Sequence, residues 1–286
     1  MRSSQIFREL IKTQELVQLP GCYDCITAKM VEKSGFPAAY LTGSGISLTL
    51  TGQPDLNTVS YLELRQVVQN IRSTVDIPML VDIDTGFGAP LNTYRLVKDF
   101  ERLDIAAVQI EDQMMPKKCG HELGRVLVSD TEMVKRIRTI YENREENGLV
   151  IVARTDARTV VGLDEAIRNL YLGAGADVIF VESPESYEEV CRIAKEINGP
   201  VLFNNVEGGR SPFLSREQLI DAGVKLTIYP NAQTRVVTKK CTELLETLKK
   251  TGSTGQMADQ MLSHKELWAM FDHEKWVAIE NKYIVR

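Results

Sequence analysis

The feature that most constrains the fold is a regular alternation of short apolar, β-branched runs with longer segments of helical spacing. Eight such runs occur, at residues 16–21, 38–43, 78–84, 106–112, 149–156, 177–183, 200–205 and 224–230. Strands separated by helices predict parallel pairing through crossover connections. The runs are apolar along most of their length rather than alternating, which is typical of a parallel sheet buried on both faces.

The segments between the runs support the same architecture. Helices are predicted at Asn92–Arg102, Ser129–Arg144 and Leu163–Leu172, where polar starts precede apolar residues at intervals near 3.6. A chain of 286 residues suits one (β/α)₈ TIM barrel with an extension, and eight regular strand–helix units favour closure of the sheet. An open doubly wound sheet is the alternative that the pattern leaves.

The C-terminal part of the chain is predicted to be a helical appendage. Thr251–Gly255 indicates a flexible joint, and a terminal helix is expected near Lys265–Lys282. We therefore expect a catalytic barrel at 1–250 and an appendage at 251–286. Trp268, Phe271 and Trp276 recur at near-helical spacing and predict a packing face, with an intersubunit contact as one use.

Composition and charge exclude several classes of protein. The net charge is −5 without a dense Lys/Arg run, which argues against a general nucleic-acid or membrane-surface binder. The N-terminus lacks the apolar stretch of a signal peptide, and no apolar run approaches the roughly 20 residues that span a bilayer. Five cysteines, an odd number in no secreted spacing, favour a reducing cytoplasm.

Polar side chains gather at the C-terminal ends of the predicted strands. They are Thr42, Ser44, Asp82, Asp84, Glu111, Asp112, Arg154, Thr155, Asp156, Glu182, Asn204 and Asn205, with Arg235 after the last strand. In a barrel these ends meet on one face, where active sites lie. At a single strand such a residue could simply mark the start of a loop. As a set they predict a site, because charges at apolar strand ends are costly unless they are paired or bound to metal.

Asp82 and Asp84 are the candidate metal ligands. Their i, i+2 spacing places two side chains on the same side of a strand. Two or three carboxylates around an open site suit Mg²⁺, which keeps waters and substrate oxygens as further ligands, and Mn²⁺ is a substitute. A strand-end turn capped by the two aspartates is the alternative that spacing alone leaves open.

Cys119 is the candidate reactive thiol. Its neighbours in the sequence are Lys117, Lys118, Gly120 and His121. This basic neighbourhood favours a thiolate, whereas a structural cysteine would normally lie among apolar residues.

Two further pairs of residues are less specific. Arg154 and Arg235 offer guanidinium forks for substrate carboxylates, although either could equally be a salt-bridge partner. Cys22 and Cys25 resemble a redox pair only superficially, so we interpret them as packing residues.

Together these motifs resemble the isocitrate lyase/phosphoenolpyruvate mutase superfamily, in particular its short carbon–carbon lyases of the methylisocitrate lyase and dimethylmalate lyase type. The resemblance extends from Pro20-Gly21 to the terminal helix. It rests on residues 42–44, 54–55, 82–88, 111–113, 117–121 and 153–157, with Glu182, Asn204 and Arg235. The Lys-Lys-Cys-Gly-His element at 117–121 marks the lyases and is absent from the phosphonate mutases.

The resemblance implies a role for each site residue. Asp82 and Asp84 would hold Mg²⁺, and Asp55 and Glu111 would order its waters. The substrate-binding residues would be Thr42, Gly43, Ser44, Gly120, Arg154, Glu182, Asn204 and Arg235. Cys119 would be the general acid, with Lys117 and His121 beside it. The base for the substrate's 2-hydroxyl group is left open between Tyr40 and a metal-bound hydroxide.

The activity that the resemblance implies is Mg²⁺-dependent retro-aldol cleavage of a small 2-hydroxy di- or tricarboxylic acid, in a homotetramer that exchanges its terminal helix between subunits. Compared with methylisocitrate lyases, the chain has Val206, Asn231 and His264 where other side chains are expected. These departures favour a dicarboxylate of the 2,3-dimethylmalate type as the substrate, which would be cleaved to pyruvate and a carboxylic acid. An oxaloacetate hydrolase is the alternative, and a phosphonate mutase or hydrolase or a non-enzymatic binding protein is less favoured.

Overall fold

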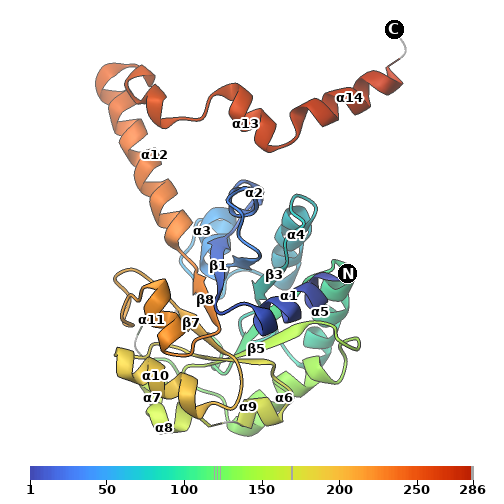
Figure 1. Cartoon of the computed structure of the whole chain (residues 1–286), viewed down its shortest axis with the longest axis vertical. Coiled ribbons are helices and arrows are strands. Elements are labelled where there is room, and N and C mark those ends of the chain that lie inside the picture. Colours follow the sequence, from blue (N-terminus) through green and yellow to red (C-terminus); the bar gives the residue numbers. More distant parts are fainter. Residues whose placement is uncertain (119, 121, 123, 169, 285–286) are drawn as a thin grey trace. The chain divides into compact units, whose positions relative to one another are not determined.

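The central element of the computed structural model is a closed barrel of eight parallel strands; all residues except 119, 121, 123, 169 and 285–286 are described (Figure 1). The strands are β1 (Val17–Cys22), β2 (Ala39–Leu41), β3 (Met79–Asp82), β4 (Ala107–Glu111), β5 (Val150–Thr155), β6 (Val178–Val181), β7 (Val201–Asn204) and β8 (Leu226–Tyr229). They pair in sequence order, and β8 closes the barrel on β1, where Val17 lies opposite Leu226. All eight predicted strands are confirmed, and the open sheet is excluded.

Helices connect the strands around the barrel. They are α1 (Ser3–Thr13), α2 (Cys25–Lys33), α3 (Gly43–Thr51), α4 (Tyr61–Arg72), α5 (Pro90–Arg102), α6 (Asp130–Tyr141), α7 (Ala157–Val160), α8 (Leu163–Ala166), α9 (Leu170–Gly173), α10 (Tyr187–Glu196) and α11 (Arg216–Asp221). Short polar side chains start several of them; Ser60 and Glu63, for example, form a capping box on α4. The helices predicted at Asn92–Arg102 and Ser129–Arg144 correspond to α5 and α6.

The helix predicted at Leu163–Leu172 is wrong as a single element. The described residues form two short helices, α8 and α9, with a turn at Ile167 after the first. Ala166 is buried in α8 and Tyr171 in α9. The apolar spacing that suggested a continuous helix is therefore satisfied by a broken one, because spacing constrains burial and not backbone continuity.

Alternation along the strands decides which side chains enter the barrel. The interior cluster includes Leu80, Val152, Phe180 and Leu202. Two residues further along the chain lie Asp82, Arg154 and Asn204, on the same side of the sheet, and Glu182, directly after β6. Phe7 of α1 is fully buried in the interior cluster, with Val17 at the start of β1. The barrel is therefore apolar towards its N-terminal end and polar at its C-terminal end, the usual place of active sites in this fold.

The chain divides into two compact units, Met1–Gln233 and Thr234–Arg286. The helices of the C-terminal part are α12 (Ala232–Thr251), the 3₁₀ helix η1 (Gly255–Gln260), α13 (His264–Met270) and α14 (His273–Tyr283). The terminal helix predicted near Lys265–Lys282 is interrupted, because Asp272 has a left-handed φ of 54°. The predicted boundary at 250/251 falls at the end of α12, and the domain assignment stays a prediction. In the part of the chain that the structure describes, no helix is long and apolar enough to cross a membrane.

Candidate active site

A cavity at the C-terminal end of the barrel contains most of the predicted site residues. Its lining includes Tyr40, Thr42, Ser44, Asp55, Asp82, Gly120, Arg154, Glu182 and Asn204. These residues come from several strands and from the loops that follow them. Closure of the barrel therefore brings together polar side chains that are far apart in the sequence, as predicted.

One part of the site is a cluster of carboxylates around Lys117. The buried Nζ of Lys117 lies 2.5 Å from Oδ1 of Asp55 and 2.8 Å from Oδ1 of Asp84. Asp82 belongs to the same cluster, and its pKa is raised to about 6 by burial and then by the charge of Asp84. Burial would lower the pKa of Lys117, but the surrounding carboxylates, Asp84 foremost, hold it well above its usual range. The cluster thus stabilises a buried positive charge.

Asp82 and Asp84 meet through a turn and not through strand alternation. The strand β3 ends at Asp82, and Asp84 adopts a left-handed φ of 48°. Its backbone N–H donates to Oδ1 of Asp82 at 3.1 Å. A Cβ atom added to Gly43 would lie 3.3 Å from Oδ2 of Asp82 and 3.8 Å from Oδ1 of Asp84. The predicted strand geometry is therefore wrong, although the two carboxylates do lie together beside Gly43.

Arg154 occupies another part of the site. Its Nη1 lies 3.5 Å from Oε2 of Glu111 and 3.6 Å from Oε2 of Glu182. Burial raises the pKa of Glu111 well above its usual range, and the charge of Arg154 opposes this rise only in part. The Nε and Nη2 atoms of Arg154 each donate to the carboxylate of Asp156 at 3.0 Å. The edge formed by Nη1 and Nη2 is the one that does not face Asp156, and its Nη1 atom faces the two glutamates.

The donor set fits a hard divalent cation that keeps part of its water shell. Oε1 of Glu111 and Oδ1 of Asn204 are buried acceptors without a hydrogen-bond partner among the described residues. The acidic side chains of the site are Asp55, Asp82, Asp84, Glu111 and Glu182. Within those same described residues, no three His, Cys, Asp or Glu side chains form a group that could bind a metal ion directly. Few direct protein ligands and several ordered waters are the usual arrangement for Mg²⁺.

Tyr40 lies at the base of this acidic cluster. Its Oη donates to Oδ2 of Asp82 at 3.0 Å and lies 3.3 Å from Oε1 of Gln109. Burial and then the charge of Asp82 hold the pKa of Tyr40 well above its usual range. The geometry therefore favours Tyr40 as a hydrogen-bond donor that orients Asp82, and the identity of the general base stays a prediction.

The backbone at residues 42–44 forms the N-terminus of α3. Oγ1 of Thr42 accepts a hydrogen bond from the backbone N–H of Gly45, which caps the helix. Oγ of Ser44 donates to Oδ1 of Asn231 at 2.7 Å. The first N–H groups of a helix attract anions, so this segment is suited to the carboxylate of a bound acid. The substrate-binding role of Thr42, Gly43 and Ser44 stays a prediction.

Gly120 connects the 117–121 element to the barrel. A Cβ atom added here would lie 2.6 Å from Nη2 of Arg154 and 2.7 Å from Oε2 of Glu182, so any larger residue would displace these two side chains. Oγ of Ser183 donates to the Gly120 carbonyl at 3.0 Å.

Three predicted site residues are not placed by these contacts. Cys119 and His121 lie outside the described residues, and Arg235 lies in α12 within the second compact unit. Their predicted roles stay predictions.

Several residues of the site were given no role by the sequence. They are Gln109 beside Tyr40, Gln113 against the backbone of Lys118, and Asp156 and Arg125, which bind each other. The sequence could have indicated Gln109 as a site residue, because it is a polar residue within an apolar strand. No such indication existed for Arg125, because a lone arginine in a loop does not reveal its partner.

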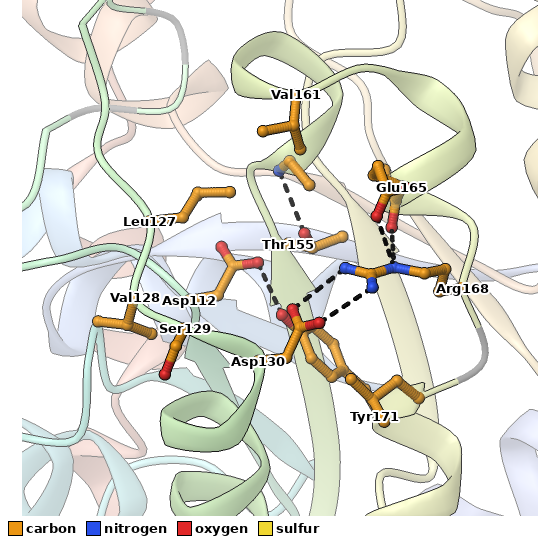
Figure 2. Close-up of a pocket in the computed structure, with 13 residues that line it drawn as sticks. Asp112, Leu127, Val128, Ser129, Asp130, Thr155, Val161, Glu165, Arg168 and Tyr171 are labelled. Atoms are coloured by element: carbon orange, nitrogen blue, oxygen red, sulfur yellow. Dashed lines mark hydrogen bonds and ion pairs between the residues drawn. The ribbon is translucent and has the colours of Figure 1, made fainter.

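A second cavity, of about 390 Å³, lies outside the barrel beside α6, α8 and α9 (Figure 2). Its charged groups bind one another: Asp112 accepts a hydrogen bond from Oη of Tyr171 at 2.9 Å, and Arg168 bridges Asp130 and Glu165. Burial and then the charge of Asp156 raise the pKa of Asp112 to about 6. Its described lining includes none of the predicted catalytic, substrate-binding or metal residues, so the barrel cavity is the candidate active site.

Comparison with known protein families tests the resemblance noted above. Residues 7–249 match the family model described as phosphoenolpyruvate phosphomutase. The chain belongs to the isocitrate lyase/phosphoenolpyruvate mutase superfamily. Its relatives in this superfamily are enzymes, and so is this protein.

Individual relatives are similar over almost the whole chain. A 2,3-dimethylmalate lyase from Eubacterium barkeri is 41% identical over 285 residues, which cover 99% of each chain. A 2-methylisocitrate lyase from Halalkalibacterium halodurans is 38% identical, covering 96% of this chain and 91% of that protein. The solved structure of an oxaloacetate acetylhydrolase in complex with 3,3-difluorooxalacetate has a TM-score of 0.92 at 28% identity, covering 98% of this chain and 97% of the other.

Proposed function

We propose that this chain is a Mg²⁺-dependent carbon–carbon lyase that cleaves a small 2-hydroxy dicarboxylic acid of the 2,3-dimethylmalate type into a 2-oxo acid such as pyruvate and a second carboxylic acid. The observation that carries the proposal is the barrel cavity, in which an acidic cluster and the guanidinium of Arg154 lie beside Lys117 and Gly120. One cavity therefore offers groups suited to a cation and groups suited to a carboxylate.

Substrate binding follows from the groups that the cavity presents. The 2-oxo acid end of the substrate would lie between Arg154 and the N-terminus of α3, where two kinds of donor meet its carboxylate. Mg²⁺, held at Asp82 and Asp84 through few direct contacts and with its waters ordered by Asp55 and Glu111, would supply Lewis-acid polarisation of the 2-oxygen. Glu182 and Asn204, which are hydrogen-bonded to each other, would support these waters.

The reaction requires one bond to break and two protons to move. Removal of the proton from the 2-hydroxyl group lets its electrons form the new carbonyl, while the bond between C2 and C3 breaks. The electron pair of that bond passes to the departing fragment as an enediolate. Cys119 would donate its thiol proton to the C3 carbon of this fragment, which leaves as the carboxylic acid. The ammonium of Lys117 and the amide groups of the 117–121 loop would stabilise the charge that develops.

The lining of the cavity supports a short, alkyl-bearing substrate. Phe180, Val206, Ile228 and Pro230 form its apolar part. A third carboxylate placed against these side chains would lose its water without gaining a charged partner from them. His264, the other departure from the methylisocitrate lyases, lies at the start of α13 in the second unit.

A substrate panel tests the proposal. The purified chain with Mg²⁺ is expected to release 2-oxo acid from 2,3-dimethylmalate with a kcat/KM about 10- to 100-fold above that for 2-methylisocitrate or isocitrate, the effect of one missing charged contact. Coupled reduction of the 2-oxo acid and detection of oxalate measure the products. A tricarboxylate that outperforms every dicarboxylate would contradict the substrate size. Oxalate released from oxaloacetate, without cleavage of any 2-hydroxy acid, would instead establish the oxaloacetate hydrolase alternative, which the similarity to oxaloacetate acetylhydrolase supports.

The assembly is proposed to be a homotetramer with exchanged terminal helices. None of the described residues in α12, α13 or α14 is buried, and Trp268 and Trp276 are 53% and 68% exposed. Large aromatic side chains on an element without a core of its own favour burial against another copy of the chain. Sedimentation equilibrium is expected to give four times the mass of one chain, and a monomer at micromolar concentration would contradict the assembly.

The cysteines bear on the compartment in which the protein works. The cysteines that the structure describes, Cys22, Cys25, Cys191 and Cys241, are free thiols, and Cys22 is buried in the core. Free thiols support a reducing compartment such as the cytoplasm as the place where this enzyme works.

A further inference from the structure

Arg125 is a buried cation that the reaction described above does not use. Its side chain is 1% exposed, and its Nη1 forms an ion pair with Oδ1 of Asp156. Its Nη2 donates to Oγ1 of Thr159 at 2.6 Å. Burial of a guanidinium costs free energy unless its N–H groups are paired. The ion pair with Asp156 and the hydrogen bond to Thr159 offset this cost.

The partner of Arg125 is the same carboxylate that holds Arg154. Asp156 is fully buried and accepts from Nε and Nη2 of Arg154, each at 3.0 Å, while Arg125 shares its Oδ1 atom. Burial would raise the pKa of Asp156, but Arg154 and then Arg125 hold it below its usual range. One carboxylate therefore fixes two guanidinium groups, and the triad Arg154–Asp156–Arg125 carries a net positive charge.

This net charge matters because the rest of the cavity is acidic. Arg154 faces Glu111 and Glu182 at 3.5 and 3.6 Å, and a pair of Arg154 and Asp156 alone would be neutral. A substrate with two carboxylates needs a surplus of positive charge near its binding edge. Arg125 supplies that surplus through the carboxylate that it shares with Arg154, in a buried environment where charges interact strongly.

We propose that Arg125 is a positioning residue that acts through Asp156 on Arg154: it shares the carboxylate, keeps the Nη1–Nη2 edge of Arg154 directed at the cavity, and provides the charge that favours dianionic over monoanionic ligands. The proposal rests on the proposed function to the extent that Arg154 is taken to bind a carboxylate of the substrate. A purely structural role, in which Arg125 only anchors the loop that follows Gly124, is the competing account.

Binding of two anions of different charge separates these accounts. Oxalate as the dianion and pyruvate as the monoanion are titrated by calorimetry into the full-length protein with Mg²⁺ at pH 7.5. Arg125→Met removes the charge and keeps much of the side-chain length, and it is expected to weaken oxalate binding about 10- to 30-fold and pyruvate binding only about 3-fold. Arg125→Lys retains the charge and is expected to bind both anions within about 3-fold of the wild type.

Arg158→Met is the matched control. Arg158 lies nearby in α7, but it pairs with Glu185 and Glu189 and not with Asp156. Its loss changes the net charge of the chain by the same amount, so both affinities should stay at their wild-type values if the effect depends on the triad.

Folding of the variants is checked by thermal denaturation, because removal of one partner from a buried ion pair can be strongly destabilising. If Arg125→Met does not fold, Thr159→Ala, which removes the 2.6 Å hydrogen bond to Arg125, is expected to weaken oxalate binding two- to four-fold more than pyruvate binding. If either variant loses affinity for oxalate and for pyruvate by the same factor, the proposal is overturned. A wild type that binds neither anion would also overturn it. Failure of the proposed function appears differently, as a wild type that binds oxalate but cleaves no acid of the substrate panel.

Discussion

Replacement of Cys119 by serine is expected to lower kcat about 10²- to 10⁴-fold, the usual contribution of a general acid. Serine has nearly the same size but is a far weaker acid, so protonation of the departing enediolate fails while the substrate site is unchanged. Arg154 and the acidic cluster are untouched by the change, and KM should therefore stay within a few-fold of its wild-type value. Steady-state kinetics on the best substrate of the panel measure both constants.

The other four cysteines are the controls for this experiment. Burial raises the pKa of Cys22 far above its usual range, and its side chain packs in the core, which makes it an unreactive thiol. Iodoacetamide should inactivate the wild type, and bound oxalate should protect it. Near-normal turnover of Cys119→Ser, combined with loss of activity on replacement of Cys25, Cys191 or Cys241, would show that the acid had been assigned to the wrong residue.

Removal of divalent cations is expected to abolish turnover, by at least about 100-fold, and added Mg²⁺ or Mn²⁺ should restore it. Lys117 bridges Asp55 and Asp84 and can neutralise only part of the acidic cluster, in which Glu111 keeps an oxygen without a partner among the described residues. A divalent ion would neutralise the remaining negative charge and would also polarise a substrate oxygen. The ammonium of Lys117 alone does not polarise a substrate oxygen. Dialysis against EDTA followed by titration of each metal measures the dependence.

Two variants link the metal requirement to this site. Asp82→Asn should raise the Mg²⁺ concentration for half-maximal activity about 10-fold or more, because one anionic ligand is lost. Asp164→Asn removes an aspartate whose side chain is 83% exposed and should leave the metal dependence unchanged. Full activity of the wild type in excess EDTA after exhaustive dialysis would refute the metal-dependent mechanism.

The architecture and the location of the site could be predicted to a large extent. Each of the eight apolar runs must be buried on both faces, and a chain with eight such runs separated by helices has few ways to bury them all. Asp82, Arg154 and Glu182 were expected to meet because each lies at the C-terminal end of its strand, and the barrel cavity contains all three.

Backbone breaks were less accessible to prediction. The apolar spacing at 163–172 and 265–282 suggested continuous helices, but spacing reports only which side chains seek burial. Where the chain leaves helical geometry, as at Asp272, depends on one residue adopting a left-handed conformation, and an aspartate does so only in some contexts. The same limit applies to Asp84, which approaches Asp82 through a turn that the i, i+2 spacing does not reveal.

By itself the sequence predicted eight strand–helix units, the end at which polar residues gather, and the family, because these follow from the periodicity of apolar residues and from local motifs, whereas closure of the sheet was observed in the structure. Only the tertiary structure decided which charges bind one another. Lys117 lies 62 positions from Asp55, and Arg125 lies 31 positions from Asp156. Such contacts depend on how the barrel closes and on the rotamers that packing allows, and no local pattern encodes a distance between residues so far apart in the chain.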